Sequence, residues 1–169
     1  MTDYKLLCMQ AREMIAADPW YVPALSNLSA LLMDTLPDLN WVGFYLLRGD
    51  RLVVGPFQGK PACVHIPKGK GVCGTSLERD EVLNVPDVHA FPGHIACDSA
   101  SRSELVIPLH QHGTPVAVLD IDSPLPNRFT PEDQEGLTGV AKLIETMILD
   151  VDGNEENGEI MKLSSAVSL

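Results

Sequence analysis

The chain has 169 residues, a formal net charge of −11 at pH 7, and apolar side chains at 45% of its positions. This length fits one domain with its own core, and the apolar content excludes a disordered chain. The negative charge argues against nucleic acid and anionic membranes as partners, because phosphate groups bind clustered Lys and Arg, and it favours a ligand with a cationic group.

Two amphipathic helices are predicted at the start of the chain. The first covers residues 3–17, and the second covers about 22–35, where Pro37 closes it. Apolar residues recur at helical spacing in both segments. The first stripe consists of Tyr4, Leu7, Ala11, Met14 and Ile15, and the second consists of Leu25, Leu28, Leu31, Leu32 and Leu36.

The segment WVGFYLLRGDRLVVGPF predicts a β-hairpin that turns at Gly49 and Asp50. The following Gly- and Lys-rich residues favour a short helix near Gly71, and residues 81–85 favour a short strand. Residues 87–103 show neither helical nor strand periodicity. A long loop inside a compact domain is usually functional or disordered, and the Pro, Phe and Gly around this one favour an ordered functional loop.

The last third of the chain predicts two strands and a helix. The strands cover residues 104–111 and 114–122 and are joined at His112-Gly113. The helix starts at Thr130, where Pro131 and Asp133 complete a capping-box pattern. We therefore expect a domain over residues 1–150 and a mobile tail over 151–169, which is rich in Gly, Asn, Glu and Ser.

This order of elements predicts an α+β fold, in which a central antiparallel sheet is flanked by the N- and C-terminal helices. Tight hairpins make neighbouring strands antiparallel, and the amphipathic helices must bury their apolar faces against the sheet. No apolar run approaches the ~20 residues of a membrane span. The charged N-terminal segment also lacks the apolar core of a signal peptide, so we expect a cytoplasmic protein.

Three of the four cysteines, Cys63, Cys73 and Cys97, lie in the middle of the chain. Thiols are kept reduced in the cytosol, so we interpret them as free thiols, metal ligands or catalytic groups. Metal sites favour close pairs such as CxxC, whereas these spacings are ten and twenty-four residues. No metal is expected on this ground, although five histidines keep a site possible. Burial as small apolar side chains and a redox pair are the other two interpretations.

Three acidic residues stand out among apolar strand residues. Asp120 and Asp122 are two positions apart in a predicted strand, so their side chains share one face of the sheet. Together with Glu104 they line either a solvated face or a pocket. In a pocket their pKa values would be raised, and one of them could donate a proton. Trp41 opens the first strand and either packs in the core or forms an apolar wall for a ligand.

Five stretches of the chain closely resemble the free methionine-(R)-sulfoxide reductases, a family built on a single GAF domain. These stretches are NWVGFY, ACVHIPKGKGVCGTS, VPDVHAFPGHIACDSASRSELVIPL, AVLDIDSP and NRFTPEDQEGL. The resemblance covers about Tyr4 to Ile148. The second and third stretches are specific to that family, whereas FTPED is shared by many GAF domains.

The resemblance implies a role for each matching residue. Cys97 corresponds to the catalytic cysteine, Cys63 to the resolving cysteine and Cys73 to a third, auxiliary cysteine. The acidic lining of the substrate pocket corresponds to Glu104, Asp120 and Asp122, and its aromatic side to Trp41 and Tyr45.

The implied reaction is reduction of free methionine-(R)-sulfoxide through a sulfenic acid and an intramolecular disulfide, with thioredoxin as reductant, no cofactor, and a homodimeric enzyme. Carboxylates near Cys97 disfavour its thiolate, so the substrate's ammonium group, His94 or loop N–H groups must offset them. The alternative is a GAF-type module that binds a small ligand or senses redox state without turnover. Such sensors usually stand beside an output domain in longer chains.

Overall fold

The computed structural model describes residues 2–95, 97 and 99–150, so the predicted mobile tail over 151–169 lies outside the described residues. A six-stranded antiparallel sheet with the order β3-β2-β1-β6-β5-β4 forms the centre of the fold. The strands are β1 (Trp41–Arg48), β2 (Arg51–Gly59), β3 (His65–Pro67), β4 (Leu83–Val85), β5 (Ser103–Gln111) and β6 (Thr114–Ser123). The predicted α+β class with an antiparallel sheet is confirmed.

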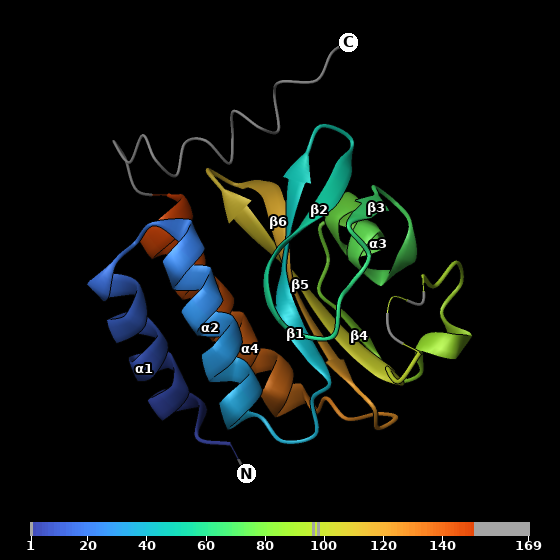
Figure 1. Cartoon of the computed structure of the whole chain (residues 1–169), viewed down its shortest axis with the longest axis horizontal. Coiled ribbons are helices and arrows are strands. Elements are labelled where there is room, and N and C mark those ends of the chain that lie inside the picture. The colour runs from blue at the N-terminus through green and yellow to red at the C-terminus, as the bar shows by residue number, and fades with distance from the viewer. Residues whose placement is uncertain (1, 96, 98, 151–169) are drawn as a thin grey trace.

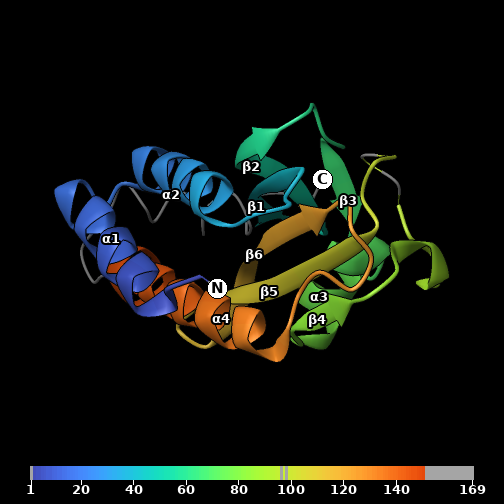
Figure 2. The same ribbon diagram turned by 90° about the horizontal axis from the view of Figure 1, so that it is seen from below.

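Helices cover both faces of the sheet. They are α1 (Tyr4–Ala17), α2 (Tyr21–Thr35), α3 (Gly71–Arg79) and α4 (Pro131–Ile144), with a 3₁₀ helix (Val88–Ala90) and a π-helix (Glu145–Leu149). Figures 1 and 2 show α2 and α4 on one face, with α1 packed on these two helices, and α3 on the other face. Within the described residues, no helix has both the length and the apolar character needed to cross a membrane.

The predicted turns and caps form where the sequence placed them. The β5–β6 turn holds His112 at φ 49° and Gly113 at φ 77°, two consecutive left-handed residues as a tight hairpin requires. At the start of α4, the Thr130 hydroxyl accepts from the Asp133 N–H at 3.2 Å, and the Asp133 carboxylate accepts from the Thr130 N–H at 2.8 Å. The predicted capping box is therefore confirmed.

Some local predictions were wrong or incomplete. Met14, assigned to the buried stripe of the first helix, is 36% exposed, because the stripe that packs against α4 and α2 contains only Leu7, Ala11 and Ile15, at a spacing of four. The short strand β3 and the 3₁₀ helix were not predicted. Segments of three residues are too short to show a periodic pattern.

The strands β1, β5 and β6 divide their side chains between two separate cores. Leu105, Ile107 and Leu109 of β5 face α1, α2 and α4, whereas the intervening Val106 faces α3. Glu104 also points toward the α3 side, since successive residues of a strand alternate between faces. The same alternation in β1 and β6 sends a second set of residues to the α3 side, where the cavity lies.

Candidate active site

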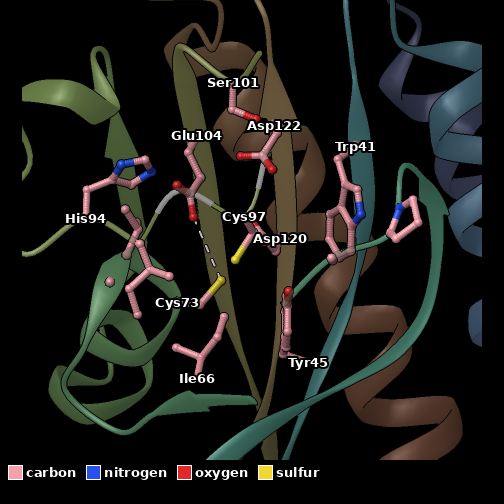
Figure 3. A pocket seen from close by; sticks show the side chains of 15 residues that line it. Trp41, Tyr45, Ile66, Cys73, His94, Cys97, Ser101, Glu104, Asp120 and Asp122 are labelled. Carbon is pink, nitrogen blue, oxygen red and sulfur yellow. Dashed lines mark hydrogen bonds between the residues drawn. The ribbon is translucent and has the colours of Figure 1, made fainter. Parts of the chain in front are cut away.

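A cavity that opens to solvent lies between the sheet and α3. The predicted site residues gather around it from β1, α3, β5, β6 and the 87–103 loop (Figure 3). Those that line it are Trp41, Tyr45, Cys73, Cys97, Glu104, Asp120 and Asp122. Cys63 is the predicted site residue outside this lining, and it is covalently joined to Cys97.

The three acids meet because of strand register. Glu104 of β5 and Trp41 of β1 are both direct partners of Asp122 on β6, and Asp120 lies two residues earlier on the same face. Glu104 is 7% exposed and Asp120 is 6% exposed, while Asp122 is half-buried. The solvated-face interpretation is therefore wrong for Glu104 and Asp120, which are buried side chains of the cavity.

Burial and mutual repulsion keep protons on this acidic cluster. Burial, followed by the charges of Asp120 and Asp122, raises the pKa of Glu104 well above its ordinary value. Burial raises the pKa of Asp120 to about 6, even though hydrogen bonds with Cys73 and Glu104 act in the opposite direction. The cluster can therefore hold a proton near neutral pH and donate it inside the cavity.

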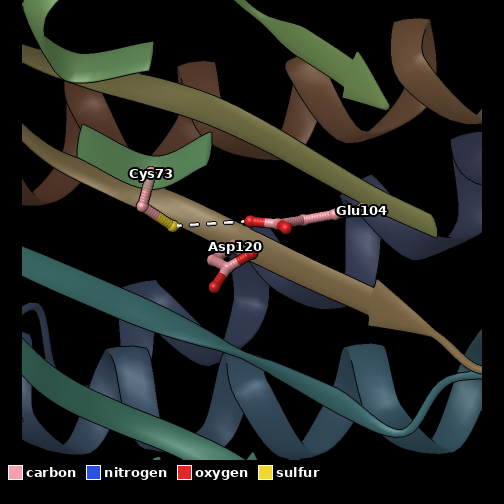
Figure 4. A group of neighbouring side chains, drawn as sticks. All are labelled: Cys73, Glu104 and Asp120. Carbon is pink, nitrogen blue, oxygen red and sulfur yellow. Dashed lines mark hydrogen bonds between the residues drawn. The ribbon is translucent and has the colours of Figure 1, made fainter. Parts of the chain in front are cut away.

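Cys73 lies on α3 directly against the acids. It is 3% exposed, and its thiol donates to Glu104 Oε1 at 3.8 Å (Figure 4). Burial and the nearby charge of Asp120 raise the pKa of Cys73 well above the ordinary thiol value. A thiol that stays protonated is a poor nucleophile, so the geometry separates Cys73 from the nucleophilic role.

Cys63 and Cys97 form a disulfide with a Cα–Cα distance of 5.3 Å across 34 residues of sequence. Both side chains are half-buried, and Cys97 lines the cavity. Cys63 is held from β1, where the Tyr45 hydroxyl donates to the Cys63 carbonyl at 3.1 Å. The fold thus brings together the two cysteines to which the resemblance assigns nucleophilic and resolving roles, and it leaves Cys8 and Cys73 as free thiols.

The loop that carries Cys97 is tied to the sheet at its C-terminal end. The Arg102 N–H donates to the Ser123 carbonyl at 2.8 Å, and the Asn40 side-chain amide donates to the Ser101 hydroxyl at 3.0 Å. Sequence reasoning did not single out Asn40 or Ser101, although Ser101 lines the cavity. The available signal was their position, since Asn40 directly precedes Trp41 and Ser101 ends the HIACDSAS stretch.

His94 also lines the cavity, but its surroundings favour the neutral ring. Burial lowers its pKa, and His89 at 6.3 Å between ring centroids acts in the same direction. A neutral imidazole supplies no positive charge to offset the carboxylates. Of the three groups considered for stabilising a thiolate at Cys97, the ligand's ammonium and the loop N–H groups fit this environment better than His94.

An aromatic wall closes the side of the cavity opposite His94 in Figure 3. The Trp41 ring stacks on Tyr45 at 5.7 Å and on Phe57 at 5.2 Å between centroids, and its indole N–H donates to the Lys60 carbonyl at 3.2 Å. Gly59 lets the chain pass this ring, because a Cβ there would lie 2.6 Å from Trp41 Cδ1. Trp41 therefore fulfils both interpretations, as core packing and as cavity wall.

The sheet, its helices and the cavity above one face define the class of the protein. The sequence profile of the GAF domain matches residues 10–148, and the chain belongs to the GAF domain family. The chain is also 50% identical over 139 residues to the free methionine-R-sulfoxide reductase of Escherichia coli, covering 82% of this chain and 84% of that protein. It is therefore a member of the free methionine-(R)-sulfoxide reductase family, as the motifs indicated.

Solved structures agree with this assignment. The reduced form of fRMsr from Staphylococcus aureus superposes with a TM-score of 0.85 at 50% identity, covering 88% of this chain and 96% of that chain. The free methionine-R-sulfoxide reductase from Neisseria meningitidis in complex with its substrate superposes with a TM-score of 0.84 at 38% identity, covering 92% of this chain and 90% of that chain.

Proposed function

We propose that this chain reduces free L-methionine-(R)-sulfoxide to methionine with Cys97 as nucleophile. The observation that carries the proposal is the placement of Cys97 at a cavity lined by Glu104, Asp120 and Asp122, within bonding reach of Cys63. The similar proteins from Escherichia coli and Neisseria meningitidis, which carry the reductase name, support the same reaction.

The first step is a displacement at the sulfoxide sulfur. The Cys97 thiolate supplies the electron pair, the sulfoxide oxygen transfers to Cys97, and methionine leaves with its sulfur reduced. The oxygen needs one proton to form the sulfenic acid, and Glu104 is the donor that fits best, because burial and two neighbouring acids keep it protonated.

The second step regenerates the thiol. Cys63 attacks the Cys97 sulfenic acid, water leaves, and the disulfide seen in the structure forms. An external dithiol such as thioredoxin then reduces this disulfide by exchange, which leaves thioredoxin oxidised. A reducing compartment such as the cytoplasm suits this cycle, because it keeps the external dithiol reduced.

The cavity also explains why a free amino acid suits the site. The ionised members of the acidic cluster pair with the substrate's ammonium group, and this positive charge in turn favours the Cys97 thiolate. The S-methyl end packs on Trp41, which is 3% exposed against its stacked neighbours. Methionine within a polypeptide has an amide in place of the ammonium group and therefore lacks the charge that this pocket recognises.

Replacement of Cys97 tests the proposal. Cys97→Ser is expected to abolish turnover of free methionine-(R)-sulfoxide in an assay coupled to thioredoxin and its reductase. Cys8→Ser is the matched control, since Cys8 lies on α1 outside the cavity, and it should retain wild-type turnover. Turnover by the Cys97 variant would contradict the proposal, and ligand binding without methionine release in the wild type would indicate a sensor instead.

The resolving role of Cys63 has a separate test. Cys63→Ser should release methionine once per reduced chain and then stop, because the sulfenic acid at Cys97 has no partner thiol. Rapid quenching with quantification of methionine measures this burst. A variant without the burst would contradict the assigned roles of the two cysteines.

The homodimer implied by the resemblance stays a prediction. Sedimentation equilibrium measures the oligomeric state and tests it.

A further inference from the structure

Three buried side chains from three different elements form a compact cluster of the residue types that bind metals. Cys73 of α3, Glu104 of β5 and Asp120 of β6 each offer one ligand atom, and these atoms lie within 4.8 Å of one another (Figure 4). The spacing of the cysteines along the chain gave no reason to expect a metal site. These three side chains come together only in the folded chain, where α3 places its thiol against two carboxylates of adjacent strands.

The spacing within this set fits tetrahedral zinc. Zn–S bonds of about 2.3 Å and Zn–O bonds of about 2.1 Å at tetrahedral angles place sulfur and oxygen ligands about 3.6 Å apart. Cys73 Sγ lies 3.8 Å from Glu104 Oε1. Small side-chain movements are therefore enough to bring this pair onto one ion.

A second observation at the same place is a buried carboxylate oxygen that could bind a cation. The Asp120 carboxyl interacts with Cys73 and Glu104, but its Oδ1 atom is buried and has no hydrogen-bond partner within the described part of the chain. The side chain lines the cavity at 6% exposure. Buried polar atoms without a partner are uncommon in folded proteins and need an explanation. A metal ion between the thiolate and the carboxylates would satisfy this oxygen.

The ligand types indicate which ion fits. Two carboxylates alone would accept Mg²⁺ or Ca²⁺, but these ions favour an all-oxygen shell and avoid thiolates. One thiolate with two carboxylates suits Zn²⁺, and three protein ligands leave a fourth position open toward the cavity for water. Binding would displace the Cys73 thiol proton and the Glu104 proton to solvent, while the zinc ion keeps its oxidation state.

We propose that Cys73, Glu104 and Asp120 form an inhibitory Zn²⁺ site that competes with the sulfoxide substrate. The inhibitory part rests on the proposed function, because the same carboxylates are assigned there to the substrate's ammonium group and to the proton. An ion held by them removes both roles and stands in the cavity that Cys97 lines. Cys73, auxiliary in the reductase cycle, thereby gains a role in regulation.

The binding test uses the oxidised protein, in which the Cys63–Cys97 disulfide removes two of the four thiols. Zn²⁺ titrated calorimetrically should bind with one ion per chain, and Co²⁺ as a probe should show thiolate-to-cobalt charge-transfer absorption. Cys73→Ser should weaken Zn²⁺ binding roughly tenfold or more and remove that absorption. Cys8→Ser changes the other free thiol and should match the wild type.

Glu104→Gln provides a second variant in case the serine substitution disturbs folding, and it should also weaken binding roughly tenfold or more. Near-ultraviolet circular dichroism shows whether each variant remains folded. Absence of binding in the wild type would overturn the proposal. An affinity unchanged in Cys73→Ser, or lost in Cys8→Ser, would overturn it as well.

The inhibition test is a single turnover by reduced protein freed of thiol reductant, which would otherwise chelate the metal. Methionine release is measured first with a chelator, then with Zn²⁺. Zinc should slow release at low sulfoxide concentration, and high sulfoxide should restore it. No release with the chelator contradicts the reductase function alone, whereas normal release that zinc does not slow contradicts the inhibitory site alone.

Discussion

The two faces of the central sheet follow the same side-chain alternation but contain different chemistry. The face under α1, α2 and α4 is filled with hydrocarbon, including Phe44, Leu119 and Ile121 at 0% exposure. The face under α3 has an apolar floor as well, but it also buries Glu104, Asp120 and the Cys73 thiol. The comparison indicates that burial of hydrocarbon on one face stabilises the fold, whereas burial of acidic side chains on the other face costs part of that stability.

Glu104→Gln should have the largest effect on the reactive face. Glutamine has nearly the same shape but cannot supply the proton that Glu104 is proposed to donate, so methionine release should fall by about 10²–10⁴-fold. Rapid-quench single turnovers measure the loss. The matched control is Glu135→Gln on the exposed side of α4, which should leave the rate unchanged. An unaltered rate in the Glu104 variant would remove this acid from the chemistry.

Phe44→Ala should have the largest effect on the hydrocarbon face. Phe44 is 0% exposed in the centre of β1, and its truncation leaves a cavity, so the free energy of unfolding should fall by about 3–5 kcal/mol. Urea unfolding measures the change. Leu6→Ala, at a side chain that is 50% exposed, should change it by about 0.5 kcal/mol or less. A loss below that of the control would show that this face does not supply the stability.

Asp120→Asn should change how stability depends on pH. The folded pKa of Asp120 is about 6 against an ordinary value of 3.8, so the folded state binds more protons between these values and loses stability as pH rises through them. For one such carboxyl the loss is about 1.4 kcal/mol between pH 5 and pH 8. The Asn variant lacks this titrating carboxyl. Its free energy of unfolding, relative to that of the wild type, should therefore be higher at pH 8 than at pH 5 by at least this amount.

Urea unfolding at pH 5 and pH 8 gives the change in the free energy of unfolding between these pH values for each protein, and the two changes are then compared. Asp34→Asn is a suitable control, because Asp34 lies near the end of α2, away from the cavity. A variant that follows the wild-type pH dependence would contradict the buried, partly protonated state of Asp120.

Thr130→Ala should have the smallest effect, because it touches neither core directly. The substitution removes the hydroxyl that accepts from the Asp133 N–H at the start of α4, and loss of such a cap costs about 1 kcal/mol. Thermal unfolding should show the decrease, while methionine release per folded chain stays at the wild-type rate. Thr130→Ser keeps the hydroxyl and should restore most of the stability, and equal losses in the two variants would argue against the cap.

The sequence predicted the parts of the site that depend on local pattern. Residues two apart in a strand share a face, so Asp120 and Asp122 were placed together before the structure confirmed that both line the cavity. The predicted hairpin at Gly49 and the cap at Thr130 likewise follow from short-range turn and capping chemistry. Family motifs supplied the link between these acids and Cys97.

Contacts between elements that are distant in the chain could not be predicted from the sequence. The thiol of Cys73 contacts Glu104, 31 positions along the chain, because α3 packs on β5 and β6. A periodic pattern in the sequence does not predict that packing. The amide contact from Asn40 to Ser101, 61 positions away, was missed for the same reason. Met14 was predicted to be buried but is exposed, because helical spacing shows which side of a helix is apolar but not how many of its residues the neighbouring helices cover.

Single-turnover release of methionine by the reduced protein tests the central claim most directly. Fully reduced wild-type chains, mixed with free methionine-(R)-sulfoxide and no external reductant, should release one methionine per chain and end with Cys63 bonded to Cys97 in a non-reducing peptide map. Cys97→Ser should release none. Methionine release from the Cys97 variant, or a wild-type product that links Cys97 elsewhere, would contradict the account.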